Sequence, residues 1–340
     1  MLLASSSSAV VSMNGSGEGD TSYANNSNFQ RVIASVTRKA RRDMAAALYC
    51  ALGRPASLAI ADLGCGTGPN ALLMVSDAVD AVLAETNNNK GASAAPLPQL
   101  HVFLNDLPAN DFNAVFRLLP SSPLAAAGCL VSAWPGSFYR RLFPEASLDY
   151  VVSSSSLHFL SKAPPMAPEH LNRSARPTAH DCYLWDLLAD ALMDMAAAGL
   201  VDEERVHSFN APYYAPCPDD LARVVAEEGS FAIRTMHLFD TTRCHLLAGG
   251  GRSHPPTSNS NKHDGEGDDE LPRWLAAETA ATIKAVVEPM LRTHFGWAAM
   301  DGLFCRYRLL LEAYYRSKAT RNKDDITNVF LVLEKKQRCY

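Results

Sequence analysis

The stretch Asp62-Leu-Gly-Cys-Gly-Thr-Gly68 is the most informative part of this sequence. It follows the apolar run 57–61 and precedes the apolar-rich segment 69–76, an order that predicts a strand, a glycine turn and a helix. Glycines let the backbone approach a ligand closely, and the first turn of the following helix offers free N–H groups. An acidic residue followed by Gly-x-Gly-x-Gly is therefore typical of a nucleotide-type site.

The spacing of the glycines bears on the identity of the ligand. A dinucleotide-binding motif requires Gly-x-Gly-x-x-Gly, and here the third glycine comes one residue early. This spacing, with its leading acid, favours S-adenosylmethionine (SAM), which has no pyrophosphate to hold, over NAD. An NAD-dependent oxidoreductase and a glycine turn that binds no ligand are the alternatives that the motif leaves open.

Composition narrows the class of protein. The chain has 340 residues, 47% of them hydrophobic, and a net charge of −5. This suits one large α/β domain with an added module, or two domains, and gives no sign of nucleic-acid or membrane partners. Eight cysteines without a Cys-x-x-Cys pair favour reduced thiols in a cytoplasmic protein. The serine-rich N-terminus lacks the basic region of a signal peptide, and no apolar run reaches the roughly 20 residues of a membrane span.

Periodicity predicts an alternation of strands and helices. Strands are expected at 58–61, 100–104, 129–133 and 148–152, and helices at 25–52, 69–83 and 112–119. Such an alternation predicts a parallel, doubly wound sheet. Later in the chain, helices are expected at 184–198 and 271–318, a strand at 231–239 and a last, buried strand at 328–334. Loop composition marks 86–98, 162–180 and a flexible insertion at 249–270.

Polar and aromatic residues follow the predicted strands, at the sheet edge where ligands bind. Asp106 can accept hydrogen bonds from both ribose hydroxyls of SAM or NAD, or can cap the turn before Pro108. Phe138, beside Ser137, can lie against an adenine or belong to the core. His158 can be a base, a partner of a carboxylate or a satisfied loop histidine. No Gly-x-Ser-x-Gly elbow and no transition-metal spacing is present.

Together these pieces resemble the plant SABATH family (salicylate, benzoate and theobromine methyltransferases). The resemblance runs from about Met13 to Lys335 and includes the segments 22–27, 62–70, 104–113, 136–144, 156–161, 208–212 and 301–307. The most specific of them is Asn105-Asp-Leu-Pro-Ala-Asn-Asp-Phe-Asn113. The family implies an α/β fold, a Rossmann-like SAM-dependent methyltransferase sheet with a helical cap.

The resemblance also implies a domain plan. It consists of a SAM-binding domain (21–200), a mainly helical cap (201–325), and a final sheet strand and tail (326–340). The Ser/Gly-rich composition of residues 1–20 predicts a largely disordered N-terminus before them. The implied residues of the SAM site are Tyr23, Ser27, Asp62, Asn70, Asp106, Leu107, Ser137 and Phe138. Gln30 would hydrogen-bond the substrate carboxylate, and His158, Phe159 and Trp185 would wall the acceptor pocket.

The implied reaction is in-line methyl transfer from a sulfonium to a carboxylate oxygen. Because a carboxylate is already ionised near pH 7, no acid–base residue is assigned, and catalysis rests on positioning and desolvation. The expected acceptor is an aromatic acid such as salicylate or benzoate, followed by jasmonate or indole-acetate. The resemblance leaves open whether the chain forms a homodimer.

Three positions depart from the family pattern. Ser155 stands where the family usually has Tyr, and Phe159 where it has Trp, so the acceptor pocket is altered. His207 replaces an Asp, which weakens a magnesium site that would otherwise use the Phe209 backbone and Asn210.

A larger departure is an absence. Residues 162–180 lead almost directly to the Trp185 helix, where family members carry a long helix and a Gly-Gly-x-Met-Val-Leu strand. One sheet strand and its crossover helix are therefore expected to be missing. The alternative function that follows is a catalytically impaired form that binds SAM weakly, or binds only a protein partner.

Overall fold

The computed structural model describes residue 13 and residues 22–88, 96–161, 183–242, 267–317 and 325–336. The predicted disordered N-terminus (except Met13), the loop 162–180 and most of the insertion 249–270 lie outside these residues. The chain divides into two compact units. The first consists of Val11–Leu157 and Ala285–Pro289, and the second of Met1–Val10, His158–Lys284 and Met290–Tyr340.

A parallel sheet forms the centre of the first unit. In the described residues its strand order is β3-β2-β1-β4, and neighbouring strands are parallel. The strands are β1 (Ser57–Leu63), β2 (Gln99–Asp106), β3 (Leu130–Pro135) and β4 (Tyr150–Val152). The predicted α/β class and the four predicted strands are confirmed, although β4 starts at Tyr150 rather than at residue 148.

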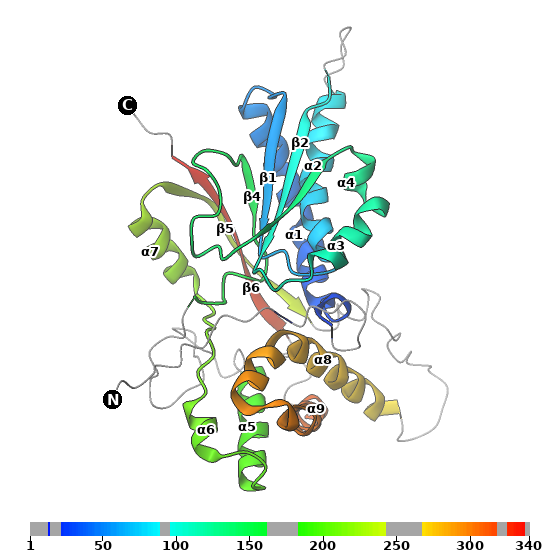
Figure 1. Ribbon diagram of the computed structural model, residues 1–340, viewed down its shortest axis with the longest axis vertical. Helices are drawn as coiled ribbons and strands as arrows, with labels where there is room; N and C mark the ends of the chain where they lie inside the picture. Colours follow the sequence, from blue (N-terminus) through cyan, green and yellow to red (C-terminus); the bar gives the residue numbers. More distant parts are fainter. Residues whose placement is uncertain are drawn as a thin grey trace. The chain divides into compact units, whose positions relative to one another are not determined.

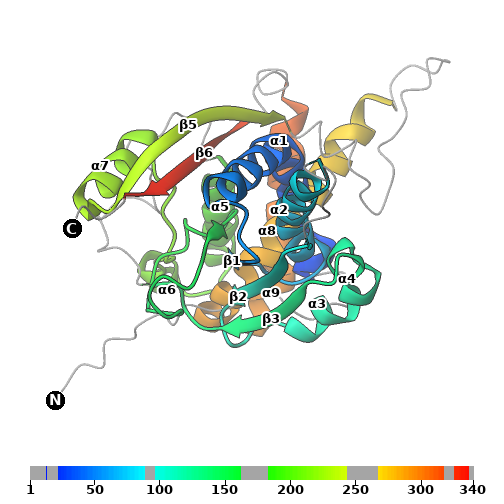
Figure 2. The same cartoon turned by 90° about the horizontal axis from the view of Figure 1, so that it is seen from above.

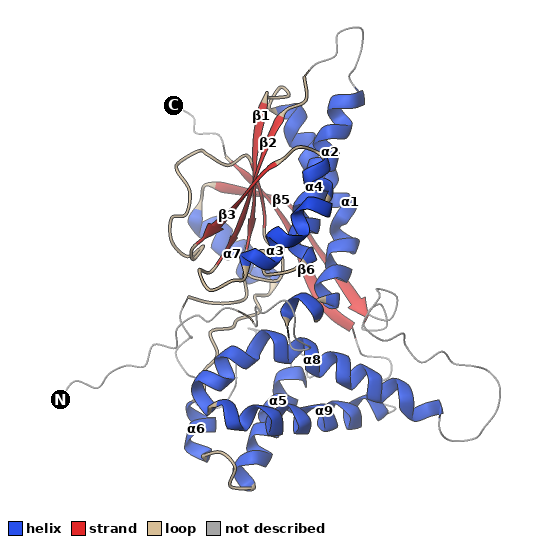
Figure 3. Cartoon of the chain, turned by 45° about the vertical axis from the view of Figure 1, so that its right-hand side comes forward, coloured by secondary structure: helices blue, strands red, loops and turns tan. Residues whose placement is uncertain are grey.

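One face of this sheet carries the helices of the first unit (Figures 2 and 3). They are α1 (Asn28–Ala51), α2 (Pro69–Asn88), α3 (Phe112–Leu118) and α4 (Pro123–Ala126), with the 3-10 turns η1 (Tyr23–Asn25) and η2 (Leu119–Ser121). Alternate residues of β1 and β2, such as Ile60 and Val102, are completely buried under these helices. On the opposite face Val151 is 48% exposed.

Two other predicted boundaries in this unit were also wrong. The predicted loop from residue 86 is still part of α2, because Thr86 is buried, with its hydroxyl 3.0 Å from the Val82 carbonyl oxygen and 3.2 Å from the Tyr49 hydroxyl. The helix expected from residue 25 begins at Asn28, because Tyr23–Asn25 form a separate 3-10 turn. Tertiary contacts thus override local composition here.

The second unit is rich in helices (Figure 1). Its elements are α5 (Tyr183–Ala197), α6 (Glu203–Ser208), α7 (Pro218–Glu228), β5 (Phe231–Thr242), α8 (Gly267–Phe295, without Ala285–Pro289), η4 (Trp297–Ala299), α9 (Met300–Arg316) and β6 (Asp325–Lys335). The Tyr315 hydroxyl joins three helices, since it lies 3.3 Å from the Tyr183 hydroxyl and 3.1 Å from the Thr279 hydroxyl. None of the helices in the described part combines the length and apolarity needed to cross a membrane.

The last strand does not join the parallel sheet in the described residues. It pairs with β5 in a separate antiparallel sheet. The prediction that this strand is buried was wrong, because every residue from 326 to 335 is at least partly exposed. A two-stranded ribbon cannot enclose its own side chains. Within the described part the parallel sheet ends at β4, as expected if a neighbouring strand is missing.

Candidate active site

The glycine loop between β1 and α2 can be built only with glycine. Gly64, Gly66 and Gly68 all have positive φ angles, of 79°, 67° and 94°. A Cβ on Gly68 would lie 2.7 Å from the Cβ of Ala24, and one on Gly64 would lie 2.5 Å from the Cβ of Ser156. The segment before α1 and the segment after β4 therefore both press against this loop.

Asp106 braces the glycine loop from the end of β2. Its two carboxylate oxygens accept hydrogen bonds from the backbone N–H groups of Gly66 and Leu107, each at 2.7 Å. Burial raises the pKa of Asp106, and these two hydrogen bonds lower it. The turn-capping alternative is thus realised. It is compatible with the ribose role, because each carboxylate oxygen has a second lone pair.

Asp62, near the end of β1, is a buried acid. Asp62 is only 2% exposed. Burial and the neighbouring Asp106 raise the pKa of Asp62 from 3.8 to about 8, and the charge of Arg41 lowers it. A cationic ligand would stabilise the ionised form of this buried carboxyl.

Unsatisfied polar groups occur before α1, in α1 and in the first turn of α2. The Asn70 side-chain amide donates to the Ser27 carbonyl and hydroxyl oxygens, at 3.0 and 2.9 Å. Ser22 Oγ, Gln30 Oε1 and Asn70 Oδ1 are buried and have no hydrogen-bond partner in the described part of the chain. Because buried polar atoms are normally satisfied, these three fit a site that a polar ligand completes.

The predicted cofactor residues all belong to the first unit, and several meet at the glycine loop. An atom of the Tyr23 ring lies 3.0 Å, and one of the Phe138 ring 3.5 Å, from where Cβ atoms of Gly66 and Gly64 would be. Ser137 accepts a hydrogen bond from the Tyr139 N–H at 3.3 Å. Asn110 was missed by the sequence analysis, although its amide donates to the Gly66 carbonyl at 2.9 Å. It lies in the segment 104–113 that carried the resemblance.

Three of the predicted acceptor residues belong to the second unit, where a fourth aromatic residue joins them. Tyr213 lies 4.8 Å from His158 and 4.8 Å from Trp185, measured between ring centroids, and His158 lies 4.6 Å from Phe159. The Tyr214 N–H donates to the His158 carbonyl at 2.8 Å, which fixes the two segments together. Sequence reasoning missed Tyr213, which comes directly after the segment 208–212.

His158 is uncharged near pH 7. Burial of the ring lowers the pKa of His158 from 6.5 to about 4. The neutral imidazole can donate or accept one hydrogen bond per ring nitrogen, but it brings no positive charge to a carboxylate. Ser155, which stands in place of the family's Tyr, has a φ of 54°, so the backbone turns sharply just before this histidine.

The predicted magnesium site, with the Phe209 backbone and Asn210 as donors, stays a prediction. The Phe209 ring packs against His294 and Phe295, and the exposed His207 ring lies 3.6 Å from Glu203. No group of three or more His, Cys, Asp or Glu side chains that could hold a metal occurs among the described residues. Magnesium prefers a nearly complete shell of oxygen ligands, so we assign no step to a metal.

Comparison with known proteins settles the family. The family model described as SAM dependent carboxyl methyltransferase matches residues 8–176 and 170–336. The chain belongs to this family. It is 33% identical to the jasmonate O-methyltransferase of Arabidopsis thaliana, over 92% of this chain and 96% of that protein. It is also 33% identical to the salicylate carboxymethyltransferase of Clarkia breweri, over 96% of this chain and 98% of that protein.

A solved structure gives the same fold for this carboxyl methyltransferase. A loganic acid methyltransferase with SAH superposes with a TM-score of 0.74, covering 96% of this chain and 99% of that one at 24% identity. The predicted Rossmann-like fold and the resemblance to the SABATH family are confirmed. SAM is the cofactor of this family, which removes the NAD alternative.

The same comparisons bear on the absent segment. The alignments with the two relatives extend over 388 and 376 residues, more than the 340 residues of this methyltransferase, so the relatives carry residues that it lacks. The family model matches in two pieces that meet at residues 170–176. This break falls inside 162–180, where the strand and crossover helix were expected to be missing.

Proposed function

We propose that this carboxyl methyltransferase forms methyl esters of small carboxylic acids, with SAM held at the glycine loop by the predicted cofactor residues. The observation that carries the proposal is the pair of acids, Asp62 and Asp106, close to a glycine loop that only glycine can form. SAM has a sulfonium and an ammonium group, so a buried acidic site suits it. The orphaned oxygens of Ser22, Gln30 and Asn70 supply further partners for a polar ligand.

We further propose an aromatic acid, such as salicylate or benzoate, as the acceptor. The rings of His158, Tyr213 and Trp185 meet with centroid separations of 4.8 Å, a lining that suits a flat ring. Jasmonate is the second candidate. Ser155 and Phe159 are smaller than the Tyr and Trp that the family usually has, and this leaves room for a bulkier acid.

The proposed mechanism needs no proton transfer. When bound, SAM supplies an electrophilic methyl group. Gln30 orients the acceptor carboxylate, which is ionised at neutral pH and is itself the nucleophile. The neutral His158 contributes at most a hydrogen bond, because its pKa of about 4 leaves it without charge. The residues of the site therefore act by positioning two reactants and excluding water.

Calorimetry with SAM and with its demethylated product analogue tests the cofactor proposal. We expect both to bind the purified chain, and NADH not to bind. A panel of salicylate, benzoate, jasmonate and indole-acetate, analysed for methyl esters by mass spectrometry, then ranks the acceptors. Binding of NADH without SAM would contradict the proposal, and binding of neither would support the non-catalytic alternative.

Trp185→Ala should weaken acceptor binding selectively. Loss of the ring that lies 4.8 Å from Tyr213 should raise the Kd for salicylate about tenfold, while the Kd for SAM stays within about twofold. Titration of salicylate into protein saturated with the product analogue measures this without turnover. Trp297→Ala is the control, since Trp297 is 68% exposed and belongs to a separate 3-10 turn. Equal loss of both affinities would make Trp185 a residue of the core.

Asp62→Asn should stabilise the protein in alkaline solution and weaken SAM binding. The pKa of Asp62 is raised from 3.8 to about 8 in the folded chain, so its ionisation opposes folding. The resulting loss of stability is absent below about pH 4 and grows as the pH rises to about 8. We expect the variant to unfold a few degrees higher than wild type at pH 8, with no difference near pH 4. If the difference in unfolding temperature between variant and wild type is the same at pH 4 and pH 8, the pKa of Asp62 is not raised by folding.

A further inference from the structure

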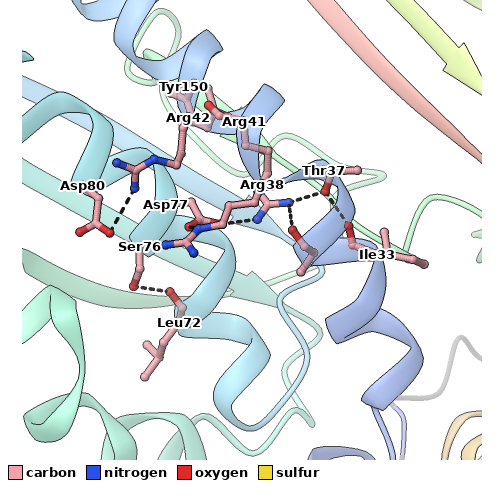
Figure 4. Close-up of polar contacts among 11 residues, drawn as sticks. Ile33, Thr37, Arg38, Arg41, Arg42, Leu72, Ser76, Asp77, Asp80 and Tyr150 are labelled. Carbon is pink, nitrogen blue, oxygen red and sulfur yellow. Dashed lines mark hydrogen bonds and ion pairs between the residues drawn. The ribbon is translucent and has the colours of Figure 1, made fainter. Parts of the chain in front are cut away.

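Arg41 is the only lysine or arginine that is buried among the described residues, at 3% exposure. Its guanidinium forms an ion pair with Asp77 of α2 and donates to the Ala34 carbonyl, at 2.9 Å, and to the Thr37 hydroxyl (Figure 4). Arg38, on the same helix, bonds the other oxygen of Asp77 at 2.8 Å, but its own side chain is 57% exposed. Asp77 is thus held by two arginines, of which only Arg41 is enclosed.

The strand register places Arg41 on the face of the sheet that Asp62 shares. Ile60 and Asp62 are two residues apart on β1 and point to the same face. Tyr150 of β4 is paired with Ile60 and therefore points to that face as well. Its hydroxyl donates to the Arg41 carbonyl at 3.3 Å, so this turn of α1 lies over the strands that lead to Asp62.

Among the described residues, Arg41 is the one buried cation that acts on Asp62. Asp106 approaches from β2 and raises the pKa of Asp62, whereas Arg41 lowers it. Tyr23, Cys65 and Tyr150 face the same region, and burial raises the pKa of each, so they stay uncharged near neutral pH. Asp77, together with Arg38, is the remaining charged neighbour, and it competes with Asp62 for Arg41.

We propose that Arg41 is a positioning residue for the cofactor site. Its buried guanidinium fixes α1 to α2 through Asp77, and its positive charge stabilises the ionised form of Asp62. The inference rests on the proposed role of Asp62 in binding SAM. It makes Asp77, which does not touch the glycine loop in any described contact, a second determinant of cofactor affinity.

The test exploits two variants that break the same ion pair but change the charge in opposite directions. Calorimetry gives the Kd for SAM from pH 6 to pH 9. Binding by wild type should strengthen as the pH rises toward about 8, because Asp62 becomes ionised. The midpoint of this pH dependence should move to higher pH in Arg41→Met and to lower pH in Asp77→Asn, by about one unit each. Below the midpoint, a shift of one unit changes the Kd for SAM about tenfold.

Three controls separate electrostatics from packing. Arg41→Lys keeps the charge and should keep the midpoint near that of wild type. Arg42→Met breaks the partly exposed Arg42–Asp80 pair, whose N–O distance is 3.3 Å, and should leave the midpoint unchanged. The amino group of SAM also titrates near pH 8, but it does so equally in every variant, so only differences between midpoints count. Midpoints that stay together, or that move in the same direction, would overturn the inference.

Thermal unfolding without SAM measures the interaction between Arg41 and Asp62 independently. Ionisation of Asp62 lowers the free energy of unfolding between pH 5 and pH 8. This loss should be larger in Arg41→Met and smaller in Asp77→Asn than in wild type. If Arg41→Met does not fold, Asp77→Asn and Arg41→Lys carry the comparison. Failure of wild type to bind SAM at any pH would refute the proposed function, whereas unfolding curves with an unchanged pH dependence would refute the role of Arg41.

Discussion

The 340-residue chain should methylate carboxylic acids at least about a hundredfold more slowly than a variant in which residues 162–182 are replaced by the corresponding longer segment of a relative. The alignments with two relatives extend over 388 and 376 residues, more than the 340 of this chain, and the family match is divided at residues 170–176. Product analysis with salicylate and benzoate measures the difference. Thermal unfolding of both proteins shows whether the restored segment also stabilises the fold.

The physical reason lies in the sheet. A crossover and returning parallel strand needs a dozen or more residues, and in the described part of the chain β4 is bonded to β1 alone. An unpaired strand edge exposes backbone groups, and Val151 on β4 is 48% exposed. Each buried backbone group left without a partner costs about 1–3 kcal/mol, against a typical net stability of about 5–15 kcal/mol.

The position of the cofactor site suggests that SAM binding survives better than turnover. The predicted cofactor residues all belong to the first unit, whereas His158, Phe159 and Trp185 follow β4 and belong to the second. A flexible Gly/Ser insertion of the same length at residues 162–182 is the matched control, because it restores chain length without a strand. Activity in the chimera but not in this control would confirm the missing strand, and robust turnover by the short chain would refute it.

The sequence was a good guide wherever a local pattern determined the structure. Apolar runs located β1 and β2, and the glycine spacing located a loop whose φ angles only glycine adopts easily. Local patterns failed where a distant contact decides the outcome. Thr86 has a loop-like neighbourhood but is held in α2 by Tyr49, and no pattern in the strand 328–334 reveals that β5 is its partner.

The site shows the same division. Asp62 and Asp106 could be predicted because they stand at strand ends beside a motif. The partnership of Arg41 with Asp77 could not, because it joins α1 to α2 across a separation of 36 residues and depends on how these helices dock. Tyr213 was missed for a similar reason, since only the folded chain brings it against His158 and Trp185.

Asp106→Ala should weaken SAM binding at least tenfold. A charge-assisted hydrogen bond is worth about 1.5–3 kcal/mol, and the proposed carboxylate makes such bonds to ribose hydroxyls. The substitution also removes the acceptor of the Gly66 and Leu107 N–H groups, so the glycine loop loses its brace. Asp111→Ala is the matched control. Asp111 caps α3 by accepting from the Ala114 N–H at 3.0 Å, so its loss should cost about 1 kcal/mol of stability and leave SAM affinity unchanged.

A double-mutant cycle separates the two roles of Asp106. A cofactor analogue without ribose hydroxyls should bind wild type more weakly than SAM, but should bind Asp106→Ala about as well as SAM does, because the partner of those hydroxyls is already gone. If Asp106 only braces the loop, the analogue loses the same factor in both proteins, and the ribose assignment falls. A coupling of the expected size would mean that the carboxylate uses its remaining lone pairs for the cofactor while the backbone holds it in place.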